Sequence, residues 1–128
     1  MMKVISTPNA PAAIGPYSQA IEIGDTIFTS GIIPIVPSTG NVVGYSVEEQ
    51  TRQVLDNLKA LLEDAGSSIE NVIKTTVFIK NMDDFSKIND IYATYFTGVL
   101  PARSCVEVAK LPKNVKLEIE AIAIKVTK

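Results

Sequence analysis

The sequence predicts an α+β domain in which one β-sheet carries two helices on a single face. Stretches rich in strand-forming residues and two amphipathic stretches follow the order strands, helix, strand, helix, strands. Two helices can cover only one face of a single sheet. No linker, repeat or low-complexity segment divides the 128 residues, a length typical of one domain, so we expect a single domain over residues 1–128.

Turn-forming residues divide the first part of the chain. Residues 8–16 hold three prolines and one glycine among small residues and predict an irregular loop. Gly24-Asp25 predicts a two-residue hairpin turn, and residues 34–44 predict a second loop. The strands predicted between these breaks are residues 3–6, 18–23 and 26–30.

The clearest predicted helix spans residues 46–65. Ser46 and Glu49 have the spacing of a capping box, and Gly66 is a typical helix-ending residue. Apolar residues recur at helical spacing: Val47, Val54, Leu55, Leu58, Leu61, Leu62 and Ala65. Charges of alternating sign line the opposite face: Arg52, Asp56, Lys59 and Glu63. We therefore expect one side of this helix to pack on the core.

A second helix follows the next strand. Residues 72–80 predict that strand and residues 82–96 the helix, with Asp83 and Asp84 near its positive N-terminus. The apolar stripe of this helix consists of Phe85, Ile88, Tyr92, Tyr95 and Phe96. Two further predicted strands complete the domain, residues 103–109 and 115–126.

Two predicted strands carry apolar residues on both faces. Residues 77–79 and 121–124 are continuous apolar runs, whereas a strand with one solvated face alternates. The mean hydropathy of +0.21 is high for a small monomer. Since there is no third helix, burial against other copies of the chain is the simplest cover for the second face. The alternative is a monomer with an exposed apolar face, which is less favoured because large apolar patches seldom stay exposed.

The composition excludes several classes of function. Twelve Lys and Arg against 14 Asp and Glu give a net charge of −2, so we do not expect a nucleic-acid partner. The chain has no histidine and one cysteine, Cys105, which excludes a Ser-His-Asp system, a Cys-His nucleophile, a Cys/His zinc site and an internal disulfide. There is no phosphate-binding loop and no dinucleotide fingerprint.

Targeting and membrane signals are also missing from the sequence. The longest charge-free stretch, residues 26–47, is broken by proline and glycine, and residues 1–13 do not resemble a signal peptide. We therefore expect a soluble cytoplasmic protein with no membrane partner. The single thiol fits a reducing compartment.

Arg103 is the more informative of the two arginines. It opens a predicted strand, and Cys105 and Glu107 share its face at a period of two. A guanidinium in this position can hold a carboxylate through two hydrogen bonds. That carboxylate could belong to a substrate or to an internal glutamate, and residue type alone favours an internal partner or a solvated side chain.

Glu118 and Glu120 lie on one face of the last predicted strand. Ile122 and Ile124 share that face. A carboxyl group at an apolar patch tends to have a raised pKa and can exchange protons near neutral pH. The alternative, which residue type alone favours, is that both are edge charges or pair with lysines.

Four other residues are candidates. Tyr17 follows a rigid Gly-Pro pair, although loop tyrosines are more often packing residues, and Ser30 precedes Gly31, which permits close approach of a ligand. Cys105 is more often a small core residue, although a basic side chain lies two residues away. Asn89 could lie at the surface or at an interface.

Several segments together resemble the RidA/YjgF family of enamine/imine deaminases. They are GPYSQA at 15–20, SG and IP within 30–34, KTTVF at 74–78, DF at 84–85, IN at 88–89, PARSCVEVAKLP at 101–112 and EIEAIAI at 118–124. They span the chain in the family's order. Two features depart from the family's pattern. Ile32 stands where many members carry Gln, and the link over residues 96–101 is short.

The resemblance implies a chorismate mutase-like mixed sheet backed by two helices, with three copies closing a central barrel. It also implies hydrolysis of reactive enamines and imines such as 2-aminoacrylate to a 2-oxo acid and ammonia, that is, a 2-iminobutanoate/2-iminopropanoate deaminase. The family needs no cofactor or metal, and its pockets lie between adjacent subunits.

The resemblance also assigns roles to residues. Arg103 would bind the substrate carboxylate, and the backbone at Cys105 would contact the imine nitrogen. Glu118, with Tyr17 and Ser30, would hold the attacking water. The remaining implied residues are Asn89 and Phe85, which would come from a neighbouring chain, and Glu120, which we expect to be structural.

Two other functions compete with the deaminase. One is a non-catalytic regulatory trimer whose pocket senses 2-oxo acids, which would need Arg103 but not the water-holding group. The other is the translation inhibitor or ribonuclease described for relatives, which the net charge and the lack of histidine disfavour. We expect the enzyme.

Overall fold

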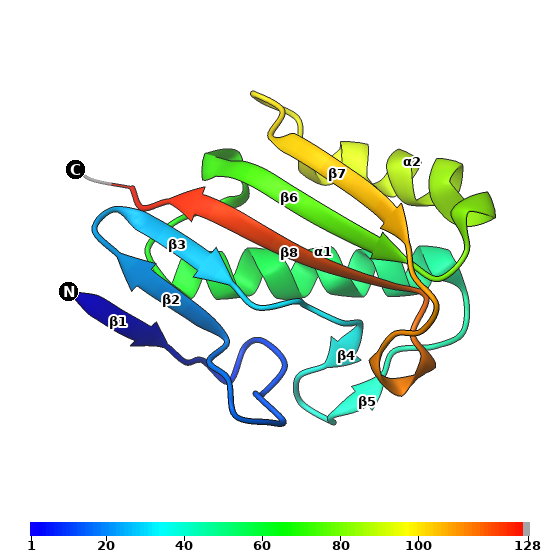
Figure 1. The fold of residues 1–128 in the computed structure, drawn as a ribbon, viewed down its shortest axis with the longest axis horizontal. Helices are drawn as coiled ribbons and strands as arrows, with labels where there is room; N and C mark the ends of the chain where they lie inside the picture. Colours follow the sequence, from blue (N-terminus) through cyan, green and yellow to red (C-terminus); the bar gives the residue numbers. More distant parts are fainter. Residues whose placement is uncertain (127–128) are drawn as a thin grey trace.

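Six strands form one mixed sheet (Figure 1): β1 (Met2–Ile5), β2 (Ala20–Ile23), β3 (Thr26–Thr29), β6 (Val72–Ile79), β7 (Ala102–Glu107) and β8 (Leu117–Ile124). Their order across the sheet is β1-β2-β3-β8-β6-β7, and only β6 and β7 run parallel. The structure, a computed structural model, describes residues 1–126, so residues 127 and 128 of the predicted domain lie outside the described residues.

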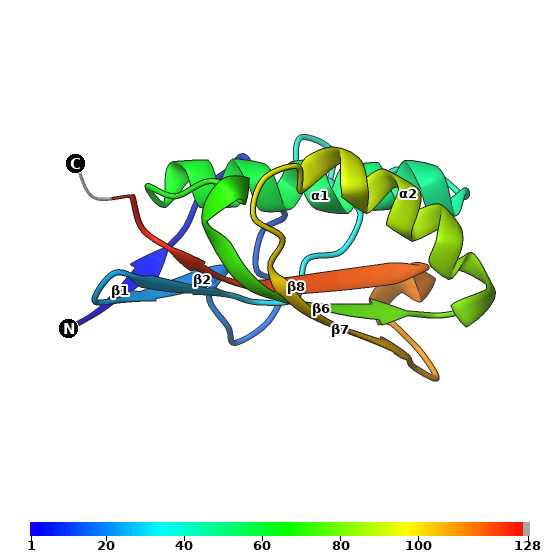
Figure 2. The same cartoon turned by 90° about the horizontal axis from the view of Figure 1, so that it is seen from above.

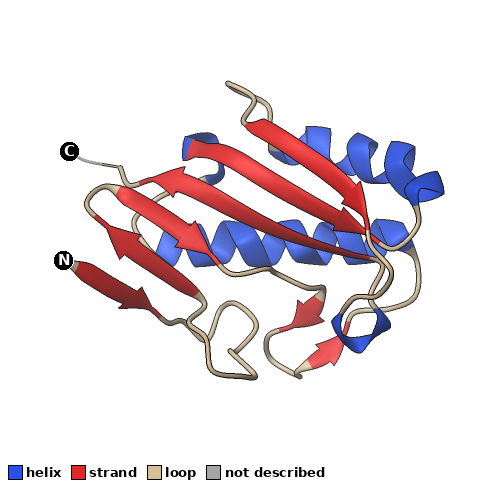
Figure 3. Ribbon diagram, viewed as in Figure 1, coloured by secondary structure: helices blue, strands red, loops and turns tan. Residues whose placement is uncertain are grey.

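Both helices, α1 (Val47–Asp64) and α2 (Phe85–Tyr95), lie on the same face of the sheet (Figure 2). Helix α2 joins β6 to β7, because two parallel neighbours need a crossover connection. Figure 3 shows the resulting two layers, with the sheet in front and the helices behind it. The predicted α+β fold with two helices on one face is confirmed.

Helix α1 forms as its sequence predicts. The Ser46 hydroxyl accepts a hydrogen bond from the Glu49 N–H at 3.1 Å, and the Glu49 carboxylate accepts one from the Ser46 N–H at 3.4 Å. Gly66 follows the helix with φ +86°, a left-handed conformation that favours glycine. Every predicted apolar position of this helix is buried, and the four charged positions of its opposite face are exposed.

The start of the second helix differs from the prediction. Residues 82–84 form a 3₁₀ turn, and the α-helix begins only at Phe85. The Asn81 side chain accepts a hydrogen bond from the Asp83 N–H at 2.9 Å, which closes a tight turn at this point. The observed helix is therefore shorter than the predicted helix over 82–96 and begins about one turn later.

The predicted loop over residues 34–44 contains a short hairpin. Its strands are β4 (Ile35–Val36) and β5 (Asn41–Val42), and Gly40 takes φ +76° in the turn between them. The Asn57 amide on α1 donates to the carbonyl oxygens of Ile33 and Ile35 at 3.2 and 2.8 Å. This side chain ties the hairpin to the helix, a long-range contact that local sequence does not reveal.

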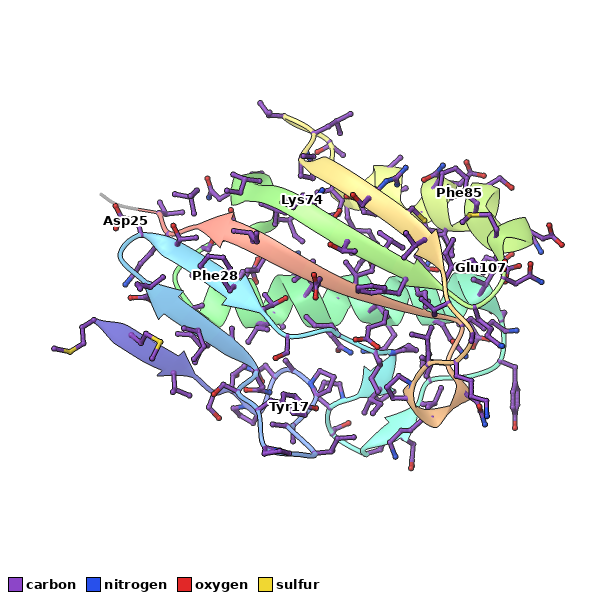
Figure 4. All side chains as sticks on the ribbon, in the orientation of Figure 1. Tyr17, Asp25, Phe28, Lys74, Phe85 and Glu107 are labelled. Carbon is purple, nitrogen blue, oxygen red and sulfur yellow. The ribbon has the colours of Figure 1, made fainter. Side chains whose placement is uncertain are left out.

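The sheet face away from the helices is apolar in part. Phe28 and Val106 on this open face are 43% and 42% exposed, and Phe28 pairs with Ile122, which pairs in turn with Lys74. Figure 4 looks onto this face, where Phe28 and Lys74 are labelled. The prediction that both faces of the sheet carry apolar side chains is confirmed.

Packing of α1 on the sheet should dominate stability. Leu58 is 0% exposed, so we expect Leu58→Ala to lower the free energy of unfolding by about 2–5 kcal/mol through lost burial and the cavity it leaves. Urea denaturation measures this. Lys59→Ala on the exposed side of the same helix is the matched control and should change the value by less than about 0.5 kcal/mol. Equal effects of the two substitutions would contradict the packing described.

Candidate active site

Arg103 is the centre of a cluster on the helix side of β7. Its Nη1 donates to Asn89 Oδ1 at 2.7 Å. Its guanidinium carbon lies 4.8 Å from the Tyr92 ring centroid and 5.5 Å from that of Phe85, both on α2. These contacts hold the guanidinium through an amide and two aromatic faces. We call Arg103, Asn89, Phe85 and Tyr92 the arginine cluster.

The positive charge in the arginine cluster is not neutralised by a carboxylate. Among residues 1–126, no Asp or Glu lies within salt-bridge distance of Arg103. The ion pair within these residues is elsewhere and joins Lys125 Nζ to Glu22 Oε2 at 3.3 Å. The Arg103 side chain is exposed and keeps free N–H donors after its bond to Asn89. The internal glutamate partner considered from the sequence is therefore not found, and an external carboxylate can bind.

Cys105 lies two residues along β7 on the same face as Arg103. Its side chain is half-buried and packs against the core. Burial raises the pKa of the Cys105 thiol, and the positive charge of Arg103 opposes that shift. A thiol with a raised pKa is a poor nucleophile at neutral pH, so this site gives no support to thiolate chemistry.

A second group of predicted residues lines a cavity of about 470 Å³. Tyr17, Ser30, Glu118 and Glu120 bring polar groups to its wall, and the remaining lining residues are Ile14, Gly31, Ile33 and Pro112. We call this the carboxylate cavity. Burial raises the pKa of Glu118, and the negative charge of Glu120 raises it further. A carboxyl group in this state can take up and release a proton closer to neutral pH.

The wall of the carboxylate cavity is held by a network around Gln19. The buried Gln19 amide accepts from the Thr7 N–H at 2.7 Å and donates to the Thr7 and Pro11 carbonyl oxygens at 3.0 and 2.8 Å. Ser30 Oγ donates to the Ser18 carbonyl oxygen at 2.6 Å. These bonds hold the loop that carries Tyr17. The Ser30 hydroxyl is thus committed as a donor and has only acceptor capacity left for a ligand.

The arginine cluster and the carboxylate cavity lie on opposite faces of the sheet. Thr75 pairs with both Arg103 and Ala121, on the helix side, whereas Phe78 pairs with both Val106 and Glu118, on the open side. Figure 4 labels one residue of each group, Phe85 at the start of α2 and Tyr17 on the N-terminal loop. One chain therefore does not bring the predicted site residues together.

This arrangement corrects one detail of the expected site. Asn89 and Phe85 contact Arg103 of their own chain, so relative to that anchor they do not come from a neighbouring chain. Glu118, Tyr17 and Ser30 form the group that is separate from Arg103. Glu120 lies beside Glu118 in the cavity and raises the pKa of that residue, which adds an electrostatic effect to the structural role expected for it.

Tyr92 belongs to the predicted apolar stripe of α2 and was not among the predicted site residues. Its ring stacks on Phe96 at 4.3 Å, and its hydroxyl shares a 2.8 Å hydrogen bond with the Thr75 hydroxyl. Burial raises the pKa of Tyr92, while the Thr75 hydrogen bond and the Arg103 charge lower it. The spacing of Phe85, Asn89 and Tyr92 by four and three places them on one side of a helix, which is the signal that could have revealed this role.

No group of three or more His, Cys, Asp or Glu side chains that could hold a metal ion occurs within residues 1–126. Over the same residues, neither helix combines the length and the apolar character needed to cross a membrane.

Comparison with known proteins gives close matches over nearly the whole chain. A RutC family protein of Pyrococcus horikoshii is 57% identical over 125 residues, which cover 98% of this chain and 99% of that protein. An Escherichia coli protein named 2-iminobutanoate/2-iminopropanoate deaminase is 54% identical over 128 residues, with 98% and 99% covered. The mouse protein of the same name is 52% identical over 122 residues, with 95% and 90% covered.

Solved structures agree with the sequence matches. The crystal structure of the YjgF gene product from E. coli has a TM-score of 0.91 at 51% identity and covers 97% of this chain and 99% of that one. A sequence model described as Endoribonuclease L-PSP matches residues 7–125. The chain therefore belongs to this family, the YjgF/RidA family that its motifs resemble.

Proposed function

We propose that this protein is a 2-iminobutanoate/2-iminopropanoate deaminase, which hydrolyses reactive enamine and imine products to a 2-oxo acid and ammonia. The observation that carries the proposal is an arginine held without a carboxylate partner, together with a half-buried glutamate whose pKa is raised. Relatives at 52–54% identity that bear the deaminase name support it.

The reaction makes modest demands on the protein. Water adds to the electrophilic imine carbon of a small 2-imino acid, and the resulting carbinolamine loses ammonia to leave a 2-oxo acid. One water is consumed and the C=N bond becomes C=O, so no electrons are transferred. Fixing the substrate carboxylate and holding one water against the imine carbon therefore supply most of the catalysis.

Arg103 is the anchor for the substrate carboxylate. The guanidinium has five N–H donors, of which one on Nη1 is used by Asn89, so a planar pair of donors remains for two parallel hydrogen bonds. The rings of Phe85 and Tyr92, over which the guanidinium carbon lies, limit the movement of the group. The backbone at Cys105, two residues along β7, is the contact proposed for the imine nitrogen.

Glu118 is the group that handles the proton. As water attacks, the carboxylate accepts a proton from it, and the same proton is then delivered to the departing amine. A raised pKa makes the Glu118 carboxylate a stronger base than that of an ordinary glutamate, and it increases the fraction of the carboxyl group that is protonated near neutral pH and can donate. Tyr17 and Ser30 line the same cavity and offer oxygen atoms that can position the water.

We further propose that each complete site forms between neighbouring copies in a homotrimer whose open sheet faces close a central barrel. Two observations support this assembly: the arginine cluster and the carboxylate cavity lie on opposite faces, and the open face carries exposed apolar side chains. The arginine cluster of one copy would then meet the carboxylate cavity of the next.

A ribonuclease is less well supported than the deaminase, although the family description includes that name. The chain has a net charge of −2 and no histidine for acid–base catalysis on a phosphate ester. Binding to phosphates would also require a set of cationic side chains and would weaken strongly with salt.

Arg103→Ala should suppress turnover without causing the assembly to dissociate. In the proposed assembly a neighbouring copy and the substrate cover Arg103, and loss of such a desolvated anchor commonly costs about 2–5 kcal/mol, so we expect the rate to fall by about thirtyfold or more. In the assay, a pyridoxal-phosphate serine dehydratase generates 2-aminoacrylate, and semicarbazide traps it. The activity of the added protein is measured as the decrease in the amount of trapped product. Arg52→Ala changes the only other arginine, exposed on α1, and should remain active. A fully active Arg103→Ala variant would overturn the assignment of the anchor.

Glu118→Gln should lower turnover more than it weakens binding of 2-oxobutanoate, the product formed from 2-iminobutanoate. Because burial and Glu120 raise the pKa of Glu118, its basic form is populated only above a higher pH than usual, so wild-type turnover should rise with pH through that value. The Gln variant should lose this rise. Rates across pH and calorimetric binding of 2-oxobutanoate measure both effects, and an unchanged pH profile would remove Glu118 from the mechanism.

The assembly has its own test. Light scattering should give a mass near three times 13.8 kDa for the wild-type protein. Phe28→Asp places a charge on the exposed apolar face and should yield a folded monomer without deaminase activity, as judged by circular dichroism and the trapping assay. A wild-type monomer that is fully active would contradict the shared site.

A further inference from the structure

Gly31 lies where β3 leaves its regular pairing with β8. Phe28 pairs with Ile122, whereas Ile32 pairs with Ile119, so the chain between these pairs has one residue more than β8 has opposite it. The Thr29 hydroxyl accepts the Ala121 N–H at 3.0 Å in place of a backbone carbonyl. Such bulges re-aim side chains and are common beside functional sites.

Two backbone hydrogen bonds then fix Gly31 against β8. The Ile32 N–H donates to the Ile119 carbonyl at 2.8 Å, and the Ile119 N–H donates to the Ile32 carbonyl at 3.0 Å. Both bonds join Ile32 to Ile119, the residues that directly follow Gly31 on one strand and Glu118 on the other. The sheet therefore fixes the backbone beside Gly31 and beside Glu118, and the Glu118 side chain reaches diagonally toward Gly31.

The Glu118 side chain occupies the space that a side chain at position 31 would need. A Cβ atom added to Gly31 would lie 1.7 Å from Glu118 Oε2 and 2.6 Å from its carboxyl carbon. The glycines with positive φ among residues 1–126 are Gly24, Gly40 and Gly66. The backbone at Gly31 thus suits any residue, and the close approach of the carboxylate is what requires glycine here.

We propose that Gly31 is a positioning residue for Glu118: its bare Cα lets the carboxylate lie against the backbone, within the wall of the carboxylate cavity beside Tyr17 and Ser30. This inference rests on the proposed function, in which Glu118 handles the proton. Any side chain at position 31 pushes the carboxylate away from the wall. Displacement by about an ångström can cost a hundredfold in rate.

The chain provides a matched control. A Cβ added to Gly44 would lie 2.7 Å from Glu49 Oε2, so this glycine makes the same kind of contact with a glutamate. Glu49 belongs to the capping box of α1, and neither residue lines the carboxylate cavity. Gly44→Ala therefore creates a milder clash of the same kind away from the site.

The experiment compares Gly31→Ala and Gly44→Ala in the trapping assay, each alone and combined with Glu118→Ala. We expect Gly31→Ala to lower turnover by roughly a hundredfold, the lower end of what a positioned acid–base group contributes, while 2-oxobutanoate still binds through Arg103. Gly44→Ala should stay active. In the Glu118→Ala background, Gly31→Ala should have no further effect on the rate. Full activity of Gly31→Ala, or a further loss in that background, would overturn the proposal.

Thermal unfolding gives a readout that does not depend on activity. Gly31→Ala should lower the melting temperature in the wild-type background and not in the Glu118→Ala background, because the clash is then absent. If Gly31→Ala fails to fold and the double variant folds, the contact is confirmed. If the wild-type protein proves inactive while this coupling is observed, the proposed function fails and the contact stands. Equal destabilisation in both backgrounds would refute the contact.

Discussion

The alternation of side chains along strand β8 determines which of its residues enter the core and which face the open side of the sheet. Leu117, Ile119, Ala121 and Ala123 point to one side and are buried under the helices, and the residues between them point to the other. Because β8 is central, between β3 and β6, its register fixes both layers at once. A slip by one residue would place Glu118 and Glu120 in the core and expose the apolar set. The energy of core burial thereby holds the two carboxylates on the open face.

The same alternation decides what a single chain can do. On β7, Arg103 and Cys105 follow the helix-facing row, because their partners Thr75 and Val77 on β6 are buried in the core. Arg103 thus gains the aromatic and amide support of α2 and loses any direct approach to Glu118. No rotamer change bridges the two faces of a sheet. A reaction that needs both Arg103 and Glu118 therefore requires two copies of the chain to associate. The apolar open face is a second reason for such association.

Sequence reasoning succeeded where the determining contacts are local. The capping box, the apolar spacing of α1 and the Gly24-Asp25 turn depend on residues a few positions apart, and all were predicted. The hairpin of β4 and β5 was missed because Asn57, more than twenty residues away, anchors it. The site residues were named from motifs, but their division between two faces follows from strand pairing. The contact between Gly31 and Glu118 likewise joins segments that only the fold brings together.

The separation of Arg103 from Glu118 also has an electrostatic consequence. A guanidinium beside a carboxylate stabilises the charged form and lowers the pKa of the acid. In this chain the groups that act on Glu118 are its apolar surroundings and Glu120, and both raise its pKa. An assembled site would place a substrate carboxylate on Arg103. The negative charge of that carboxylate would offset the positive charge of Arg103, so Arg103 would have little effect on the pKa of Glu118. In the proposed reaction, Arg103 and Glu118 can therefore serve one substrate without first neutralising each other as an ion pair.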